Sequence, residues 1–443
     1  MTQYSHHIQT PQPTTKAPHT ALLPGLASPC THSTHHILKT HIIPSTDPTP
    51  LNTLQKLLDS TKLSHPNHHW LLTLSYNLAH TIEPSTAPAT APATAPSVPT
   101  SPTTFPHIIA QQLRPSSLLP HACGGGVRAA DGGGLLLDTS NNWSIDPKKL
   151  HLIKKSKYIN MVQKALQYIA AGDIYQVNLT HPITLPFTGS SKSLAQHLFN
   201  TTNPSMGSFT CFDDNSYPNK TTHPTRHAII SLSPETFLTF NPTTNTLTTI
   251  PMKGTSPATS DPNELYHSKK DRAELNMIID LMRNDLARIS TPGSVKITNQ
   301  RQITTHHNSV HQATATITST LKPHTTLSEI LTATFPPGSI TGAPKIRAMQ
   351  IINQLEPSIR GPYCGTTIHL TPNGSFTSSV NIRTLHIQGT PSPKSPDSFK
   401  NATLTYHTGA GIIADSIPEQ EWQETLTKAA ILQSTLNITL PQT

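Results

Sequence analysis

The order of periodic segments between residues 155 and 435 is the feature that most constrains the fold. Apolar residues recur at helical spacing in "KYINMVQKALQYIAAGD", which ends at Gly172, and the next segment, "IYQVNLTHPITL", alternates as a strand does. Two strands joined at "NPTTN" are predicted over 227–252, and one long helix over 262–290. Helices and antiparallel strands mix without strict βαβ alternation, which predicts an α+β fold.

The C-terminal third continues this mixture. "APKIRAMQIINQLEP" predicts a further helix, and "FTSSVNIRTLHI" and "LTYHTGAGII" predict paired strands around a Pro/Ser-rich loop. A last helix is predicted from Pro418, with Asp415 or Ser416 near its cap. The main domain is therefore expected over 151–440.

Residues 1–150 are expected to form a divergent N-terminal region. The segment "HPNHHWLLTLSYNLAHTIEP" holds an apolar, strand-like run around Trp70 and Tyr76. It is followed, at about 85–104, by the repeat "STAPATAPATAPSVPTSPTT". Because Pro, Ala and Thr supply little apolar surface to bury, this repeat is predicted to be a flexible insertion.

Charge and cysteine content exclude several classes of protein. The net charge of +8, from 31 Lys+Arg against 23 Asp+Glu, suits an anionic partner, but no dense basic run with interleaved aromatics indicates nucleic acid. The four cysteines form no CxxC pair, so neither a zinc site nor a disulfide framework is expected. The start lacks a signal-peptide core, and no apolar run is long enough to span a membrane. We expect a cytoplasmic protein without a nucleic-acid or membrane partner.

Two predicted helices each carry a pair of carboxylates. Asp271 and Glu274 are three residues apart, and Glu421 and Glu424 repeat the spacing, with Lys428 four residues further on. Residues at this spacing share one helix face, and two such faces could hold Mg²⁺, a cation that prefers oxygen ligands. Spacing alone favours the alternative, in which both are ordinary solvated faces.

Glycine-rich segments offer candidate anion contacts. "FPPGSITGAPKIRAMQ" leads into a helix whose exposed N–H groups could bind an anion, or Thr341 could simply cap that helix with Pro344 in its first turn. In "HTGAGIIADS", Gly409 and Gly411 could let backbone approach a ligand, or could mark a bulge. Arg383 lies in an otherwise apolar strand, where its guanidinium requires a carboxylate from a ligand or from the protein.

Lys253 stands in "TIPMKGTSP", between an apolar run and a glycine turn. An exposed turn lysine would need no explanation, and His311 and Cys364 carry no signal by themselves. The motifs become informative together. In order along the chain, eight blocks resemble the chorismate-utilising enzymes: "GDIYQVNL", "SLSPETF", "IPMKGTSP", "DRAELNMIIDLMRNDLARI", "SVHQATA", "FPPGSITGAPKIRAMQIINQLEPSIRGPYCG", "VNIRTL" and "GAGIIADSIPEQEWQETLTKA".

This family includes anthranilate synthase component I, aminodeoxychorismate synthase component I, and the isochorismate and salicylate synthases. The resemblance covers about 155–435, and "WLLTLSYNLAHTIEP" resembles an N-terminal element of the family more weakly. It implies an α+β fold of two interlocked lobes around a β-sandwich, with the site in a cleft. It also implies that Glu274 and Glu424 bind Mg²⁺, with Asp271 and Glu421 as supporting carboxylates.

The resemblance extends to substrate contacts. Arg383 and Tyr363 match residues that grip the enolpyruvyl carboxylate of chorismate, and His311 matches a histidine near the C4 hydroxyl. The remaining matches are backbone or side-chain positions that line the site: Thr341, Gly409, Ala410, Gly411 and Lys428.

Two positions, Gln176 and Lys253, distinguish reactions within the family. Family members that add water carry a lysine base where this chain has Gln176, so ammonia is the implied nucleophile. The turn "PMKGT" resembles the "PIKGT" of aminodeoxychorismate synthases rather than the "PIAGT" of anthranilate synthases, which makes Lys253 a covalent nucleophile. Glu235 matches the general acid. The implied product is 4-amino-4-deoxychorismate, made for para-aminobenzoate and folate synthesis.

The chain shows no GxCxG elbow with a downstream histidine and glutamate, so a glutamine amidotransferase partner is the implied source of ammonia. Two alternatives stay open. The first is anthranilate synthase component I, and the second is a catalytically silent, His-rich basic protein that binds metal or nucleic acid.

Overall fold

The computed structural model describes residues 35–43, 47–64, 68–86, 108–115, 142–214, 225–257, 259–306 and 310–440. From residue 87 onward, the Pro/Ala/Thr-rich repeat lies outside the described residues.

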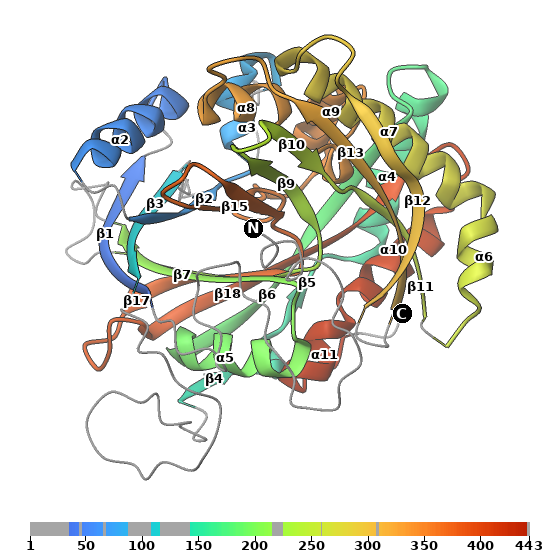
Figure 1. The fold of residues 1–443 in the computed structure, drawn as a ribbon. Helices are drawn as coiled ribbons and strands as arrows, with labels where there is room; N and C mark the ends of the chain where they lie inside the picture. The colour runs from blue at the N-terminus through green and yellow to red at the C-terminus, as the bar shows by residue number, and fades with distance from the viewer. Residues whose placement is uncertain are drawn as a thin grey trace, which may run out of the picture.

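Two antiparallel sheets form the centre of the described molecule (Figure 1). The first has ten strands, in the order β1 (His35–Ile43), β3 (Ile108–Pro115), β2 (His69–Leu74), β15 (Thr366–Leu370), β16 (Phe376–Val380), β9 (Thr236–Asn241), β10 (Thr246–Thr249), β13 (Val310–Thr320) and β11 (Met252–Pro257), with β12 (Lys296–His306) also paired to β13. The N-terminal strands β1, β2 and β3 therefore share one sheet with strands of the main domain.

The second sheet has eight strands in the described part of the chain. Their order is β14 (Gly342–Ala343), β6 (Gln176–Ser190), β18 (Ser398–Ile412), β17 (Thr384–Pro391), β8 (Thr225–Ser233) and β7 (Met206–Asp214), with β4 (Trp143–Ile145) and β5 (His151–Leu152) on β6. The two sheets touch where Leu71 and Leu113 meet Met206, and where Ile109 meets Phe212 and Ile229.

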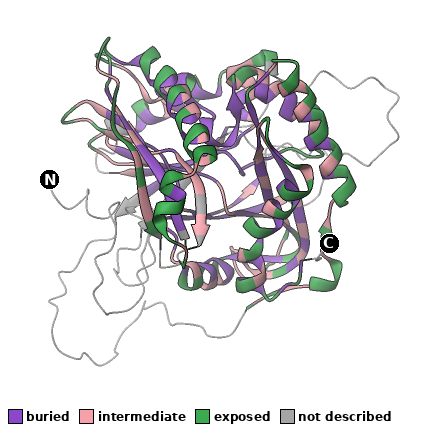
Figure 2. Cartoon of the chain, turned by 90° about the vertical axis from the view of Figure 1, so that its right-hand side faces the viewer, coloured by how far each residue is buried: buried purple, intermediate pink, exposed green. Residues whose placement is uncertain are grey.

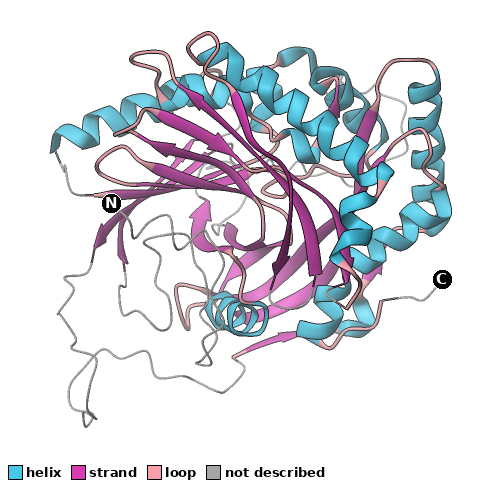
Figure 3. Cartoon of the chain, turned by 45° about the vertical axis from the view of Figure 1, so that its right-hand side comes forward, coloured by secondary structure: helices cyan, strands magenta, loops and turns pink. Residues whose placement is uncertain are grey.

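Helices cover the outer faces of both sheets (Figure 3). They are α2 (Pro50–Ser64), α3 (Leu78–Ile82), α4 (Lys155–Ala170), α5 (Ser191–Thr202), α6 (Pro262–His267), α7 (Lys269–Ile289), α8 (Leu327–Thr334), α9 (Lys345–Leu355), α10 (Pro418–Lys428) and α11 (Ala430–Leu436), with short 3₁₀ turns at Pro84–Thr86, Pro147–Lys149 and Gly338–Ile340 (η3). Strands are mostly buried, and the helices expose their outer faces (Figure 2). This arrangement confirms the α+β class.

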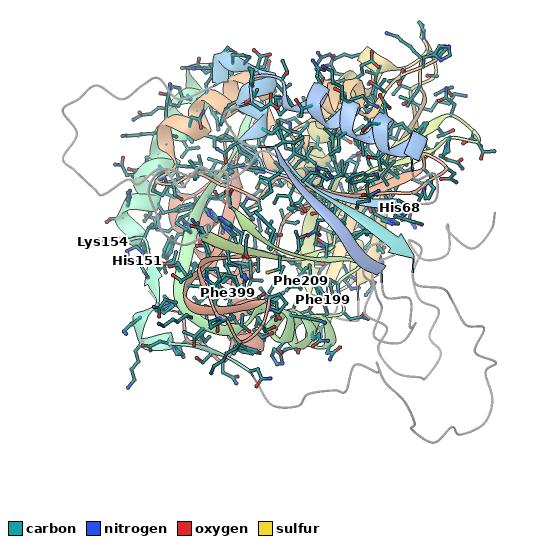
Figure 4. The ribbon with its side chains drawn as sticks, turned by 90° about the vertical axis from the view of Figure 1, so that its left-hand side faces the viewer. His68, His151, Lys154, Phe199, Phe209 and Phe399 are labelled. Carbon is teal, nitrogen blue, oxygen red and sulfur yellow. The ribbon has the colours of Figure 1, made fainter. Side chains whose placement is uncertain are left out.

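Three apolar cores lie beneath these helices. The largest packs α2, α7 and α8 on the ten-stranded sheet. The second packs α5 and α11 on the eight-stranded sheet, where Phe199, Phe209 and Phe399 gather (Figure 4). The third packs α4, α9 and α10 over one end of β6 and β18. Among the described helices, none combines the length and apolar character needed to cross a bilayer.

Two sequence predictions about continuous elements are wrong. The helix expected over 262–290 is two helices, α6 and α7, because Ser268 leaves helical geometry and its hydroxyl caps α7 by accepting from the Asp271 N–H. The strand expected through "FTSSVNIRTLHI" is also broken. Its first half is β16 in one sheet and its second half is β17 in the other, and the chain crosses between them at Arg383, where φ is +50°.

The start of α10 at Pro418 is as predicted, whereas the capping residue considered for α9 differs from the structure. Helix α9 begins at Lys345 with Pro344 as its N-cap, so Thr341 does not cap it. The N-cap of α10 is Ile417 and makes no side-chain cap hydrogen bond. Ser416 accepts from the Ile413 N–H instead, at 3.1 Å.

His181, His227 and His407 are buried, and His386 is partly buried, in and beside the sandwich. His227 is stacked between Phe212 and His386, with His227 Nδ1 3.0 Å from His386 Nε2. His407 stacks on Tyr363, and His181 stacks on Trp422 beneath α10. Burial lowers the pKa of His181 and His227 to about 4 and that of His407 to about 3, and it lowers the pKa of His386 further below its usual range. All four side chains are therefore neutral in the folded protein at neutral pH.

These histidines should make the fold acid-labile. Below pH ~6.5 the unfolded chain binds protons that the folded chain excludes, so the free energy of unfolding falls as pH falls toward the folded pKa values. Four such groups together change the free energy of unfolding by about 5 kcal/mol per pH unit. Buried carboxyls with raised pKa, Glu235 among them, act in the opposite direction. We expect a net fall of roughly 2 to 4 kcal/mol between pH 6.5 and pH 5, measured by urea unfolding.

A matched pair of variants tests this explanation. His181→Phe keeps a ring between Tyr158 and Trp422 but cannot be protonated, so the pH slope should decrease by about one histidine's share, ~1.4 kcal/mol per pH unit. The exposed residue His324 serves as the control, and His324→Phe should leave the slope unchanged. Equal unfolding free energies of the wild type at pH 7 and pH 5 would contradict the prediction.

Candidate active site

Lys253 is a largely buried lysine on the edge strand β11. It pairs with Ala313 of β13, and a bulge follows it before Thr255. Gly254 adopts a φ of +78°, and a Cβ added there would lie 2.8 Å from Asp271 Oδ1. A glycine is required because the Asp271 carboxylate packs directly against this turn. Only 13% of the Lys253 side chain is exposed, so it is not an ordinary turn lysine.

Charged groups from three other elements surround the Lys253 amine. Nζ lies 3.9 Å from Glu274 Oε2 on α7. Burial lowers the pKa of Lys253, and Lys428 acts in the same direction, whereas Glu274, Glu235 and Glu424 oppose the shift. The structure thus gathers four other predicted site residues around one amine, and burial favours its neutral, nucleophilic form.

Gly411 of strand β18 faces this amine and has no side chain to fill the space in front of it. Gly411 pairs with Asn178 of β6, and a Cβ added at Gly411 would lie 3.4 Å from Lys253 Nζ and 2.8 Å from Gln176 Nε2. The register from Gly409 through Ala410 to Gly411 is regular, so the bulge considered for these glycines is absent from this part of β18. Glycine here keeps the space in front of the amine open.

Glu235 is buried beside this space, immediately before β9. Burial raises the pKa of its carboxyl to about 7, although Ser339, Lys253 and the Met252 N–H all act to lower it. A carboxyl with a pKa near 7 can both give and take a proton at neutral pH, which suits general acid–base catalysis.

Glu274 on α7 and Glu424 on α10 both act on the Lys253 amine, so one carboxylate of each predicted pair faces this group. Glu424 forms an ion pair with Lys428 at 2.6 Å, and the Lys428 ammonium also donates to the Gly409 carbonyl at 3.2 Å. Glu421 is buried, and its Oε2 has no hydrogen-bond partner among the described residues. Burial raises the pKa of Glu421.

These carboxylates fit a magnesium ion that keeps part of its water shell. Within the described ranges, no three His, Cys, Asp or Glu side chains are grouped closely enough to hold a metal by themselves. Mg²⁺ in proteins commonly takes only one or two carboxylates, with waters and substrate oxygens completing its octahedron. Glu274 and Glu424 supply such a pair, and the unpartnered oxygen of Glu421 is an available acceptor.

Arg383 and Tyr363 both interact with Tyr406 on β18. The Arg383 guanidinium has no hydrogen-bond or ion-pair partner in the described part of the chain, and it acts on the buried Tyr406, whose pKa burial raises to about 12. Tyr406 acts in turn on Tyr363. An unpaired guanidinium is suited to a carboxylate from a ligand.

Two predicted residues bond within the protein instead. The Thr341 hydroxyl donates to the carbonyls of Pro337 and Gly338, at 3.0 and 3.3 Å. His311 contacts the Thr305 hydroxyl through Nδ1 at 2.8 Å and the Ser260 carbonyl through Nε2 at 3.2 Å. Their contacts with a substrate stay predictions.

Sequence reasoning missed two residues that the structure places here. Ser339 donates to Glu235, and Asn178 lies against Gly411. Asn178 could have been found, because it stands two residues after Gln176 in a strand and therefore shares its face. No sequence signal distinguished Ser339 from the other residues of its loop.

Comparisons with known proteins find a family profile and several relatives. The family profile described as chorismate binding enzyme matches residues 14–434. Aminodeoxychorismate synthase component 1 of Klebsiella aerogenes is 35% identical over 283 residues, which cover 62% of this chain and 57% of that protein. Anthranilate synthase component 1 of Saccharolobus solfataricus is 33% identical over 293 residues, which cover 65% of this chain and 63% of that protein.

Solved structures show the same fold. Anthranilate synthase component I from Streptococcus pneumoniae matches with a TM-score of 0.66 at 22% identity, over 95% of this chain and 93% of that one. A putative 2,3-dihydroxybenzoate-specific isochorismate synthase from Bacillus anthracis matches with a TM-score of 0.62 at 18% identity, over 91% and 92% of the two chains. The chain spans little more than half the length of the K. aerogenes relative.

Proposed function

Since the chain belongs to the chorismate binding enzyme family, we propose that it aminates chorismate at C4 to form 4-amino-4-deoxychorismate. One observation carries the proposal: the buried amine of Lys253, with a lowered pKa, shares its site with Glu235, a carboxyl with a pKa of about 7. A neutral amine and a protonated acid in one pocket are what displacement of a hydroxyl group requires.

Chorismate is a dianion, and the site offers a separate contact for each carboxylate. The unpaired Arg383 guanidinium, next to Tyr363, would bind the enolpyruvyl carboxylate. The ring carboxylate would lie toward α7 and α10. Mg²⁺ held by Glu274 and Glu424, with Asp271 and Glu421 in support, would neutralise that carboxylate and orient the ring.

The first half of the proposed reaction uses Lys253 and Glu235. Neutral Lys253 Nζ attacks C2 of the ring, the C1–C2 double bond moves to C1–C6, the C5–C6 double bond moves to C4–C5, and the C4 hydroxyl departs as water with the proton of Glu235. Covalent attachment divides one difficult displacement into two easier ones.

The second half uses ammonia. Ammonia adds at C4, both double bonds shift back, and Lys253 leaves as a neutral amine. The new ammonium group returns a proton to Glu235. Gln176 is buried at this point with its Oε1 unpartnered among the described residues, so it can accept an N–H from ammonia and cannot act as a base toward water.

A product assay with chorismate, Mg²⁺ and ammonium salt tests this function. Aminodeoxychorismate supports the proposal. Formation of anthranilate would instead favour the second candidate function, that of an anthranilate synthase component I. The 33% identity to an anthranilate synthase component 1 supports this alternative. No consumption of chorismate would contradict both.

Glutamine should not replace ammonium for the isolated chain, because the sequence carries no amidotransferase elbow. We expect turnover with ammonium chloride to rise with pH as free ammonia increases, and turnover with glutamine to stay at background. Addition of a glutamine amidotransferase subunit should then confer glutamine-dependent activity. Efficient glutamine use by this chain alone would show that a separate amidotransferase subunit is not required.

A further inference from the structure

Asn178 stands on strand β6 directly opposite Gly411 of β18. The two residues are register partners, and Gln176, two positions earlier on β6, shares the face of Asn178. A Cβ added at Gly411 would lie 2.9 Å from Asn178 Oδ1, 2.8 Å from Gln176 Nε2 and 3.4 Å from Lys253 Nζ. Three polar side-chain ends therefore border one small space that the missing side chain of Gly411 leaves open.

Hydrogen bonds to distant segments fix the direction of the Asn178 amide. Its Nδ2 donates to the Ser339 carbonyl at 2.7 Å. Its backbone N–H donates to the Thr341 carbonyl at 2.8 Å, and its backbone carbonyl accepts from Arg360 Nη2 at 2.9 Å. Because the Ser339 carbonyl can only accept, the nitrogen of the amide must face it, and the side-chain oxygen is left for the space at Gly411.

Arg360 is itself firmly held. It is only 2% exposed, and its guanidinium forms a two-pronged ion pair with Glu356, at 3.0 and 2.7 Å. Its Nη1 donates to the Ile340 carbonyl at 2.9 Å, and Glu356 Oε1 accepts from the Thr180 backbone N–H at 2.8 Å. These bonds tie strand β6 to the loop after η3 on both sides of Asn178, so the position of Asn178 Oδ1 is set by the fold.

Two side-chain oxygens at this space are open acceptors. Gln176 is 1% exposed, and its Oε1 has no hydrogen-bond partner in the described part of the chain. The only side-chain hydrogen bond of Asn178 to another described residue is the one that Nδ2 donates, so its Oδ1 accepts none from them. A buried acceptor without a donor is unfavourable, and a ligand with N–H groups would satisfy both oxygens.

We propose that Asn178 Oδ1, together with Gln176 Oε1, forms the subsite that binds the incoming ammonia. This inference rests on the proposed function and adds Asn178 to it as a binding residue for the second nucleophile. Ammonia has three N–H donors and one lone pair. Two carbonyl oxygens can therefore hold it by two N–H groups and leave the lone pair free to attack.

The place of the subsite relative to Lys253 fits the proposed chemistry. C2, which Lys253 attacks, and C4, which ammonia attacks, are separated by one ring carbon, so both nucleophiles must approach from neighbouring positions. Lys253 Nζ and Asn178 Oδ1 both lie within 3.4 Å of the Cβ added at Gly411.

The carbonyl oxygens also suit the charge that the second half-reaction creates. As the ammonia lone pair forms the bond to C4, the bond from C2 to Lys253 breaks and its electron pair returns to the lysine nitrogen. Positive charge then develops on the N–H groups of the new ammonium, and carbonyl dipoles fixed beforehand stabilise it. Amide oxygens cannot take a proton from water, so the subsite offers no base for hydroxylation.

Asn178→Ala tests the proposal through the steady-state kinetics with ammonium chloride at a fixed alkaline pH. The KM for ammonia should rise about 10-fold, which corresponds to the loss of one hydrogen bond. The KM for chorismate, and the rate of adduct formation on Lys253 without ammonia, should stay within about two-fold of the wild type. If Asn178 only supports the structure, all three quantities will change together, and that result would overturn the inference.

Further variants separate the acceptor from the bond to Ser339. Asn178→Asp keeps an oxygen at this position but loses the Nδ2 donor, so its KM for ammonia should stay below that of the alanine variant. Asn178→Leu has nearly the shape of asparagine without an acceptor, and replaces the alanine variant if that variant does not fold. Asn245→Ala is the matched control: it loses a bond of the same kind, from Nδ2 to the Leu321 carbonyl at 2.8 Å, and should leave both KM values unchanged.

A binding measurement without turnover separates this inference from the proposed function. The NMR signal of the Asn178 side-chain amide, assigned by its loss in Asn178→Leu, should shift saturably with ammonium chloride and not with sodium chloride. If the wild type consumes no chorismate, the proposed function fails, while this titration still decides whether Asn178 binds ammonia. The absence of a saturable shift, or an unchanged KM for ammonia in a folded Asn178→Ala variant, would remove the subsite.

Discussion

Lys253→Ala should abolish amination of chorismate even at saturating ammonia, with a loss of about 10³-fold or more. The physical reason is that ammonia replaces only the second nucleophile, and the first bond to the ring comes from Lys253. Burial lowers the pKa of this amine, whereas an unperturbed lysine, with a pKa of ~10.4, is almost wholly protonated at neutral pH. Chorismate consumption and product formation, followed separately, measure the effect.

Two companion variants separate nucleophile from charge. Lys253→Arg keeps a cation near Glu274 but cannot supply a neutral amine, so it should be as inactive as the alanine variant. Lys296→Ala changes an exposed lysine on β12 and should retain wild-type activity. Intact-mass analysis of the wild type with chorismate and no ammonia should show an adduct on Lys253. If Lys253→Arg forms product at a near-normal rate, the lysine is only a positioning charge.

Glu424→Gln should cause the second large loss, more than ~100-fold in kcat/KM at Mg²⁺ concentrations that saturate the wild type. Loss of residues that merely support a metal ligand already costs about 10- to 100-fold. Although burial acts to raise it, Lys428, Lys253 and Lys270 hold the pKa of Glu424 below its usual range, so the group is an anion at neutral pH. Its neutral amide replacement is a poorer ligand for a hard cation, and excess Mg²⁺ should restore activity only in part.

A control on the same helix makes this test specific. Glu419 is exposed in the first turn of α10, so Glu419→Gln should leave both activity and Mg²⁺ affinity unchanged. Isothermal titration calorimetry of both variants with Mg²⁺ and chorismate measures binding directly. Full activity of Glu424→Gln after treatment with a chelator would remove Glu424 from the metal site.

Sequence periodicity predicted the α+β class and most elements because helix and strand repeats are local properties of the chain. It failed at Ser268 and Arg383, where the structure is decided by one residue's backbone. A serine that caps the following helix splits α6 from α7. The left-handed backbone conformation of Arg383 lies between β16 and β17, where the chain passes from one sheet to the other. Neither event changes the apolar pattern on either side, so neither leaves a periodic signal.

The sequence by itself determined which chemical groups are available: an amine in a glycine turn, an acid in "SPETF", and two helices with carboxylates at i, i+3 spacing. Only the tertiary structure decided what those groups can do. The lowered pKa of Lys253 comes from burial against α7, α10 and β18, and burial raises the pKa of Glu235. Proton affinity and orientation are set by contacts between distant segments, and such contacts exist only after folding.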